Sequence, residues 1–230
     1  MIRDNILTVH KNIEEACLKA GRDPKEVTLI SVTKTKPLPD LREAYEAGER
    51  NFGENKVQEL VSKIDELPSD IKWHMIGHLQ RNKVRQIIGR VELIHSVDSY
   101  RLAEEINIQS IKKNIITPVL IEVNIGEEIS KFGVRPDEAE ELIREIAELK
   151  NVEVRGLMTV APAFDDPEET RPLFRSMHNL FVDIKNKNID NVNMCILSMG
   201  MTNDYKIAVE EGATMVRVGT AIFGPRNYNK

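Results

Sequence analysis

Along the chain, short apolar runs alternate with longer stretches in which apolar residues recur every three or four positions. The first run, Val27–Thr33, is rich in Val, Ile and Thr, and Lys34, Lys36 and Pro37 follow it directly. A continuous apolar run of this length is typical of a parallel strand covered on both faces. Lysines at the carboxyl end of such a strand stand where α/β proteins place functional groups. Two solvated lysines that simply end the strand are the alternative interpretation.

The pattern of strand, turn and amphipathic helix occurs eight times, without internal sequence similarity. An amphipathic helix from Ile2 to Ala20 precedes it and ends at Gly21. The predicted strands are Val27–Thr33, Asn51–Gly53, Lys72–Gly77, Leu93–Val97, Pro118–Asn124, Glu153–Val160, Asn193–Ser198 and Met215–Val218. The predicted helices between them are Leu38–Ala47, Lys56–Leu67, Asn82–Ile88, Tyr100–Ile111, Pro136–Leu149, Thr170–Lys185 and Asn203–Glu210.

Strict alternation of strands and helices predicts a parallel sheet with right-handed crossovers. Eight units of roughly 25 residues fit an α/β fold of the (β/α)8 TIM-barrel type with an extra N-terminal helix. We expect residues 1–230 to form one domain, because no linker or low-complexity tract interrupts the pattern. An open doubly wound sheet is the alternative, but no Gly-x-Gly-x-x-Gly motif follows any strand.

Composition and charge argue against several classes of protein. Hydrophobic residues make up 41% and charged residues 30%, which is an ordinary globular composition. The net charge is −5 with acids and bases interleaved, so we expect no nucleic-acid partner. No run of about 18 apolar residues predicts a membrane span, and the polar start does not resemble a signal peptide. A cytoplasmic protein is predicted, with Cys17 and Cys195 as buried thiols in a reducing compartment.

No metal site is predicted. His74 and His78 are four residues apart, but Gly77 and the β-like run before it argue against a helix that presents both to zinc. Neither cysteine has His or Cys neighbours at the spacing of metal ligands.

Glycines and polar residues gather where the predicted strands end. In a barrel these carboxyl ends meet at one rim, where the barrel enzymes keep their sites. The residues at this rim are Lys34, Gly53–Asn55, Gly77–His78, Ser96–Asp98, Asn124, Met158–Pro162, Ser198–Met201 and Arg217–Thr220.

Two of these clusters suggest phosphate binding. Ser198–Thr202 and Gly219–Thr220 follow the seventh and eighth strands, where barrels often hold phosphate with glycine-exposed N–H groups and hydroxyls. The alternative is that Gly200 and Gly219 only make tight turns. Arg217 interrupts an apolar strand, so it faces either the lumen with a partner or the outer layer with a helix carboxylate.

A strand-end lysine opposite a phosphate cradle suits an aldehyde cofactor that is held at both ends. Pyridoxal 5′-phosphate (PLP) fits this description, because a lysine binds its aldehyde as a Schiff base. Many sugar-phosphate barrels also carry a strand-end lysine, so a lyase or isomerase without this cofactor is a further alternative.

The motifs in combination resemble the pyridoxal phosphate homeostasis protein family over nearly the whole chain. The family's barrel is similar to the amino-terminal domain of alanine racemases. The motifs that carry the resemblance are Val32–Pro37, Phe52–Asn55, Trp73–Gly77, Leu79–Gln80, Asn82–Lys83, Gly156–Thr159, Leu197–Met201 and Val216–Gly224.

The resemblance implies a role for each residue of the cofactor site. Lys34 would form the Schiff base, and the choice of Lys34 over Lys36 rests on the resemblance, since both have the same parity along the strand. Arg217 would approach the pyridine nitrogen, and Asn55 would lie beside the ring. The phosphate would be held by Ser198, Gly200, Met201, Gly219 and Thr220.

Three further positions follow from the same resemblance. Lys131 matches a second lysine that the family uses as a possible alternative attachment point. Phe132 stands where many relatives have Ser, and Thr33 stands where Ser is usual. Neither difference removes a proposed contact, although Phe132 could alter access near Lys131.

The expected function is intracellular PLP homeostasis, in which a monomer buffers this vitamin B6 cofactor or delivers it to PLP-dependent apoenzymes. Little or no amino-acid turnover is expected, because an Arg at the ring nitrogen disfavours its protonation and weakens the electron sink. Racemisation needs a second acid/base, which racemases supply as a tyrosine with the help of an added domain. The sequence ends at Lys230 without such a domain, and no tyrosine stands at a predicted strand end; the tyrosines are Tyr45, Tyr100, Tyr205 and Tyr228. The alternative function is a small PLP-dependent racemase or decarboxylase completed by dimerisation.

Overall fold

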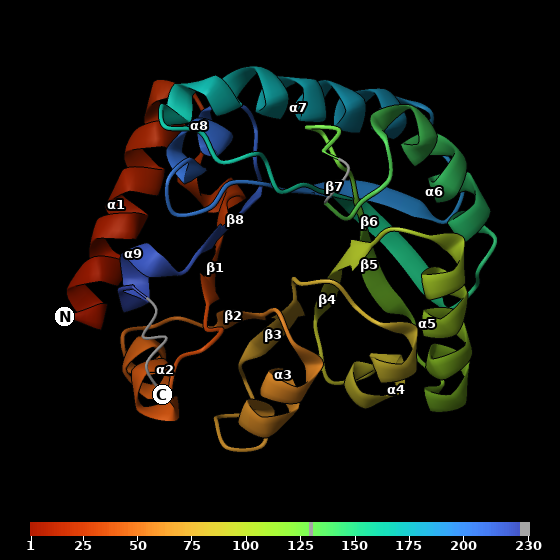
Figure 1. Cartoon of the computed structure of the whole chain (residues 1–230), viewed down its shortest axis with the longest axis horizontal. Coiled ribbons are helices and arrows are strands. Elements are labelled where there is room, and N and C mark those ends of the chain that lie inside the picture. Colours follow the sequence, from red (N-terminus) through yellow and green to blue (C-terminus); the bar gives the residue numbers. More distant parts are fainter. Residues whose placement is uncertain (129–130, 226–230) are drawn as a thin grey trace.

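The eight predicted strands close into one parallel barrel in the computed structural model, which describes residues 1–128 and 131–225. Each strand pairs with the next one in sequence, and the last pairs with the first, which excludes an open sheet (Figure 1). The strands are β1 (Thr28–Val32), β2 (Asn51–Glu54), β3 (Lys72–Met75), β4 (Leu93–Val97), β5 (Thr117–Glu122), β6 (Val152–Met158), β7 (Val192–Ser198) and β8 (Met215–Val218).

Helices follow the strands and surround the barrel, which confirms the predicted (β/α)8 fold (Figure 1). The α-helices are α1 (Ile2–Lys19), α2 (Leu38–Glu46), α3 (Val57–Ile64), α4 (Val84–Ile87), α5 (Tyr100–Lys113), α6 (Ala139–Ala147), α7 (Arg171–Asn186), α8 (Tyr205–Glu210) and α9 (Thr220–Phe223). Short 3-10 turns are η1 (Pro24–Glu26), η2 (Arg81–Lys83), η3 (Pro136–Glu138) and η4 (Pro167–Thr170).

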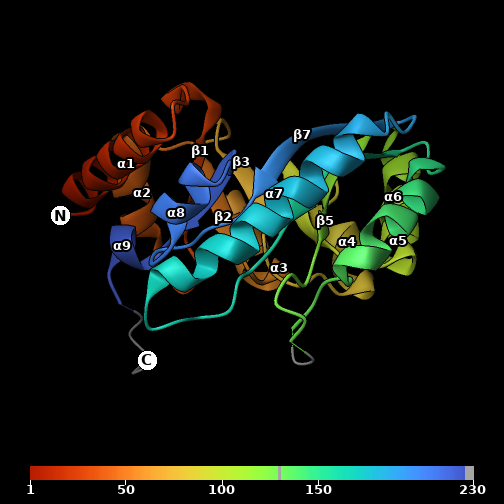
Figure 2. The same ribbon diagram turned by 90° about the horizontal axis from the view of Figure 1, so that it is seen from above.

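The extra N-terminal helix closes the ring of helices. Helix α1 packs against α2 on one side and against α8 and α9 on the other, so it joins the first and last units of the barrel (Figure 1). Figure 2 shows α1 and α7 lying along the outside of the barrel, and the segments that follow β5 and β6 projecting on one side. That side carries the carboxyl ends of the strands.

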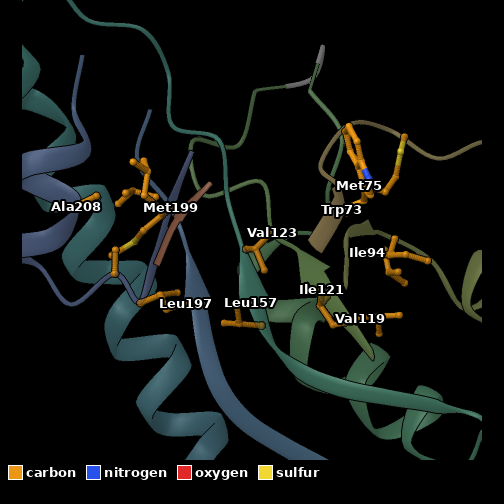
Figure 3. Packing of buried hydrophobic residues seen from close by; sticks show 14 of the residues in the cluster. Trp73, Met75, Ile94, Val119, Ile121, Val123, Leu157, Leu197, Met199 and Ala208 are labelled. Carbon is orange, nitrogen blue, oxygen red and sulfur yellow. The ribbon is translucent and has the colours of Figure 1, made fainter. Parts of the chain in front are cut away.

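The main core lies between the barrel and its helices, and it follows the period-two pattern of the strands. Side chains at alternate strand positions, such as Val119, Ile121 and Val123, are fully buried in this layer (Figure 3). Burial of each large apolar side chain contributes about 1.5–3 kcal/mol to the free energy of folding. This outer layer therefore holds the strands in register around the lumen.

The other face of the strands lines the lumen, and its apolar part is small. Leu93, Leu120 and Met158 form a separate buried cluster, against which Ile196 and Met215 pack. Nearer the carboxyl ends the lumen also holds polar side chains, and they include residues of the site described below.

The structure bears on two predictions made from composition: that both cysteines are buried and that no segment spans a membrane. Cys17 is buried and free, but Cys195 is exposed and free, so the prediction of a buried thiol at Cys195 is wrong. Cys195 lies in the middle of β7, where it and Asn193 are exposed, and its Sγ lies 3.4 Å from Nε of Arg155. No helix within the described part of the chain has the length and apolar character needed to cross a membrane.

Candidate functional site

A cavity of about 450 Å³ opens at the carboxyl ends of the strands. Its lining contains six of the eight residues that the sequence predicts for the cofactor site, and these are Lys34, Asn55, Met201, Arg217, Gly219 and Thr220. Ser198 and Gly200 do not line it. The remaining lining residues are Val32, Ile76, Val160, Ala161, Pro162, Ala163, Phe164, Pro167, Thr170, Thr202, Asn203 and Asp204.

The two lysines after β1 have different surroundings. Lys34 is half-buried and lines the cavity. Nζ of Lys36 donates hydrogen bonds to the backbone oxygens of Phe223, Gly224 and Pro225, at 2.8, 3.0 and 3.0 Å. Lys36 therefore fastens the turn after β1 to the end of α9. The structure thus distinguishes two residues that strand parity left equivalent.

Arg217 lies inside the lumen, the first of the two orientations that the sequence left open. Its side chain is buried and donates from Nη1 to Ser198 Oγ at 2.6 Å and from Nη2 to the Thr159 oxygen at 2.8 Å. Burial lowers the pKa of the guanidinium to about 10, while the nearby carboxyl groups of Glu122 and Asp204 oppose this shift. The side chain is therefore still a cation at neutral pH, and it lines the cavity from the side of the lumen.

Behind Arg217 a chain of hydrogen bonds crosses the lumen. Ser198 Oγ lies 3.0 Å from His95 Nδ1, His95 Nε2 lies 3.1 Å from His74 Nδ1, and His74 Nε2 lies 3.3 Å from the side-chain oxygen of Asn51. Since an arginine can only donate and this Asn51 oxygen can only accept, each group passes a donor to the next. The direction fixes both imidazoles as neutral tautomers with the proton on Nε2.

Burial keeps these histidines neutral. It lowers the pKa of His74 to about 3, and Lys72 acts in the same direction. Burial also lowers the pKa of His95, and the neighbouring His74 and Arg217 act in the same direction. This chain was not predicted from the sequence, although histidines within apolar strands are as conspicuous a signal as Arg217. No three His, Cys, Asp or Glu side chains in the described ranges converge as metal ligands would.

Glu122, at the end of β5, is a buried acid near the site. Burial is the main cause that raises its pKa to about 7; the neighbouring Asp98 acts in the same direction, and Arg217 opposes the shift. Oε2 of Glu122 has no hydrogen-bond partner among the described residues. The carboxyl group is therefore partly protonated at neutral pH. No pattern in the sequence indicates this protonation.

Asn55 lines the cavity and carries an unsatisfied polar atom. Its side-chain oxygen is buried and has no hydrogen-bond partner within residues 1–128 and 131–225. The backbone of Asn55 is placed there by Gly77, since a Cβ on Gly77 would lie only 2.7 Å from the Asn55 Cα. A ligand that donates a hydrogen bond at this point would satisfy the orphaned oxygen.

The predicted phosphate end of the site is built from two turns. After β7, Oδ1 of Asp204 accepts the Met201 N–H at 2.6 Å, so that donor is already used. Gly200 has φ of +91°, and a Cβ there would lie 2.5 Å from Ala208 Cβ, so the turn itself requires glycine. After β8, Gly219 packs against Val32, and α9 begins at Thr220 with N–H groups that lack intrahelical acceptors. Thr202 and Thr220 contribute hydroxyls to the lining.

Of the three further positions that the resemblance added, Thr33 directly precedes Lys34, whereas Lys131 and Phe132 do not line this cavity. Lys131 forms an ion pair with Glu128 at 2.9 Å. Phe132 stacks on the His78 ring, with centroids 3.9 Å apart. His78 borders a second hollow, of about 630 Å³, between the loops after β3 and β4. Lys131 therefore follows β5 and does not line the cavity that Lys34 lines.

Three of the four tyrosines can be placed, and none of these three lines the cavity. Tyr45 donates its hydroxyl to Asp70, and the Tyr205 hydroxyl accepts from Asn12. Tyr100 begins α5. Tyr228 lies outside the described residues.

The chain is similar to known proteins over nearly its whole length. The model of the family "Alanine racemase, N-terminal domain" matches residues 8–227. A relative from Aquifex aeolicus called "Pyridoxal phosphate homeostasis protein" is 44% identical over 98% of both chains. A protein of the same name from Escherichia coli K12 is 39% identical over 100% of this chain and 98% of the relative. The chain therefore belongs to the alanine racemase N-terminal domain family and, within it, to the pyridoxal phosphate homeostasis proteins.

Solved structures agree with this assignment. PipY of Synechococcus elongatus, solved with PLP bound, is 33% identical and superimposes with a TM-score of 0.83 over 97% of this chain and all of PipY. Alanine racemase of Clostridium difficile is 14% identical and superimposes with a TM-score of 0.76, and the match covers 57% of that chain. The racemase comparison shows a shared barrel fold alone.

Proposed function

We propose that this protein binds PLP as a Schiff base on Lys34 and acts in intracellular PLP homeostasis, as a buffer or a donor of the cofactor. The observation that carries the proposal is that Lys34, Arg217 and the turn Gly219–Thr220 line one cavity. Relatives named as pyridoxal phosphate homeostasis proteins and the PLP-bound structure of PipY support it.

The residues of the cavity fit the cofactor. The volume of about 450 Å³ lies within the range of small-molecule sites, about 300–1,000 Å³. In this proposal Lys34 takes the aldehyde end, and Arg217 faces the pyridine nitrogen. The orphaned oxygen of Asn55 accepts a hydrogen bond from the cofactor's ring hydroxyl. The phosphate is held by the hydroxyls of Thr202 and Thr220 and by the N–H groups around Gly219.

The position of Ser198 modifies the predicted phosphate contacts. Its hydroxyl lies between Arg217 and His95 and does not line the cavity. We therefore propose that Ser198 acts through Arg217, which it holds in place below the cofactor. Gly200 and Met201 shape the turn that presents Thr202.

Bound PLP supplies an aldehyde and a ring that can accept electrons. Arg217 can only donate hydrogen bonds, so it favours a ring nitrogen without a proton, and such a ring is a weaker electron sink. Among the described lining residues, the titratable groups are Lys34, Asp204 and Arg217. Oδ1 of Asp204 is engaged with the Met201 N–H. This set supports slow turnover of amino acids or none.

The attachment is tested by adding PLP to the purified protein and to two variants. Wild type and Lys36→Ala should develop imine absorbance near the visible edge, whereas Lys34→Ala should not. Borohydride reduction followed by peptide mass spectrometry should locate the label on Lys34. A label on Lys36 or Lys131, or a colourless wild type, would contradict the proposal.

Turnover is tested by deuterium exchange at Cα of the common amino acids with the PLP-loaded protein. Slow exchange supports a carrier, whereas rapid exchange would indicate a racemase or decarboxylase. Delivery is tested by mixing the loaded protein with a PLP-dependent apoenzyme and a scavenger of free PLP. Recovery of the apoenzyme despite the scavenger would show transfer by contact.

A cytoplasmic location and a monomeric state are also part of this proposal. Both cysteines are free thiols, as is usual in a reducing compartment. Sedimentation analysis at micromolar concentration should give the mass of one chain, 26.2 kDa.

A further inference from the structure

The turn that carries Lys34 has an unfavourable backbone conformation. Thr35, the next residue, has φ of +63°, a left-handed conformation that a β-branched residue rarely adopts. Such a conformation persists only where the surrounding structure fixes it. The contacts of the two neighbours of Lys34 therefore indicate what holds this turn.

Both neighbours of Lys34 are bound by helix α3. Glu59 Oε1 accepts the Thr35 N–H at 2.5 Å. Lys63 Nζ, one helical turn further on, donates to the Thr33 backbone oxygen at 2.8 Å. The backbone is thus fixed immediately before and immediately after Lys34.

The groups that provide these contacts form one buried cluster with Glu54, at the end of β2. Lys63 Nζ donates to Glu54 Oε1 at 2.7 Å and to Glu59 Oε1 at 2.6 Å. The Thr33 hydroxyl also donates to Glu54 Oε1, at 2.6 Å. The exposed fraction of the side chain is 7% for Lys63, 0% for Glu54 and 22% for Glu59.

A buried ionic cluster of this kind is a poor source of net stability. The cost of removing two carboxylates and an ammonium from water offsets most of their mutual attraction, and apolar side chains of similar size often replace them without loss. The cluster instead fixes geometry, because each of its hydrogen bonds has a defined donor and acceptor. Since these bonds hold Thr33 and Thr35, they fix the backbone on both sides of Lys34.

We propose that Lys63, Glu54 and Glu59 are positioning residues that hold the turn Thr33–Thr35 so that Lys34 points into the cavity. This inference rests on the proposed function, in which the neutral Lys34 amine adds to the aldehyde carbon of PLP and the aldehyde oxygen leaves as water when the C=N bond forms. A fixed backbone on both sides of a reacting lysine limits the orientations that its amine samples, and orientation has a large effect on rate.

The test compares the rate of imine formation with the binding of a ligand that cannot form an imine. 4′-Deoxypyridoxine phosphate has the ring and phosphate of PLP but lacks the aldehyde, so its dissociation constant reports the site without the lysine. Glu59→Ala removes the acceptor of the Thr35 N–H from a partly exposed position. We expect imine formation to slow about tenfold or more, with the dissociation constant of the analogue changed less than twofold.

Two control variants separate position from charge and general damage. Glu59→Gln keeps an oxygen that can accept the Thr35 N–H, and its rate should stay within about threefold of wild type. Glu66→Ala, which removes an exposed carboxylate just beyond α3, should behave as wild type. Lys63→Met should slow imine formation at least as much as Glu59→Ala, in a protein whose far-UV circular dichroism confirms folding.

The inference fails if Glu59→Ala forms the imine at the wild-type rate, or if its affinity for the analogue falls in parallel with the rate. The first outcome leaves the proposed function intact, because Lys34 would still bind PLP. A wild-type protein that forms no imine would overturn the proposed function, and this inference with it.

Discussion

Nη1 of Arg217 donates to the hydroxyl of Ser198 over 2.6 Å, and this bond joins the ends of β8 and β7 below the cavity. Ser198 in turn faces His95, so the arginine is the first member of a chain that crosses the lumen to Asn51. The position of the cation that faces the cavity therefore depends on side chains from four other strands, β7, β4, β3 and β2. A lumen filled in this way is a rigid support for a ligand that binds above it.

Ser198→Ala separates the two roles considered for this serine. It leaves an Arg217 N–H and His95 Nδ1 without their partner, and an unsatisfied buried polar group costs about 1–3 kcal/mol of unfolding free energy. The affinity of the protein for 4′-deoxypyridoxine phosphate, which cannot form an imine, should change only a few-fold. Thr202→Val should show the reverse, with weaker binding and nearly unchanged stability. A Ser198→Ala protein with normal stability and greatly weakened binding would instead make Ser198 a phosphate ligand.

Asp204→Asn should tighten PLP binding. Asp204 is buried and lines the cavity at the end proposed for the phosphate, so its negative charge repels the ligand. The amide oxygen of asparagine can still accept the Met201 N–H and preserve the turn. A gain of about tenfold in affinity, or about 1.4 kcal/mol, is expected from titration of absorbance. Asp165→Asn, at an exposed position of the same rim, should leave the affinity unchanged, and weaker binding by Asp204→Asn would refute this electrostatic account.

Glu122→Gln should alter how stability depends on pH. The pKa of Glu122 is about 7 in the folded protein, above its ordinary value of 4.5, so wild-type stability from this group is present below pH 4.5 and is lost as pH rises to 7. The glutamine variant does not lose stability in this way, because its side chain does not ionise. Its stability relative to wild type should therefore rise by about 3 kcal/mol between pH 4.5 and 7. Urea unfolding at several pH values measures the difference, and a pH-independent difference would show that Glu122 ionises normally.

Gly77→Ala should damage the cavity through Asn55. A Cβ at Gly77 would lie 2.7 Å from the Asn55 Cα, so the backbone at the end of β2 must move. We expect a loss of about 1–3 kcal/mol in unfolding free energy and at least tenfold weaker PLP binding. Asn55→Ala, which removes the orphaned oxygen without moving the backbone, should weaken binding and leave stability nearly unchanged. Wild-type affinity in the Gly77→Ala variant would mean that Asn55 makes no contact with the cofactor.

The barrel could be predicted from the sequence because its cause is local and repeated. Each strand is a short apolar run and most strands are followed by an amphipathic helix, and eight such units in one chain have few ways to bury their apolar faces. The rim position of Lys34, Asn55, Arg217 and Thr220 followed for the same reason, since parallel strands bring their carboxyl ends together. Strand boundaries differed by a residue or more, as at Glu153–Val160, because rim residues leave the ladder to form loops.

The environment of each polar residue could not be predicted in this way. Lys34 and Lys36 have the same parity, and only the packing of the turn against α3 and α9 sends one to the cavity and the other to three backbone oxygens. The sequence predicts that the Ser198 hydroxyl lies at the rim. In the structure this hydroxyl is hydrogen-bonded to Arg217 and His95. Cys195 is apolar in type and exposed in fact.

By itself, the sequence determined the order of strands and helices, the closed barrel that this order implies, and the edge at which chemistry can occur. These depend on hydrophobic period and on chain connectivity, which are properties of neighbouring residues. The tertiary structure alone decided which lysine lines the cavity, which donors are already used, and how the lumen holds Arg217. Those properties depend on hydrogen bonds and burial between residues far apart in the chain, and their energies are set by distances of a few tenths of an ångström that no linear pattern encodes.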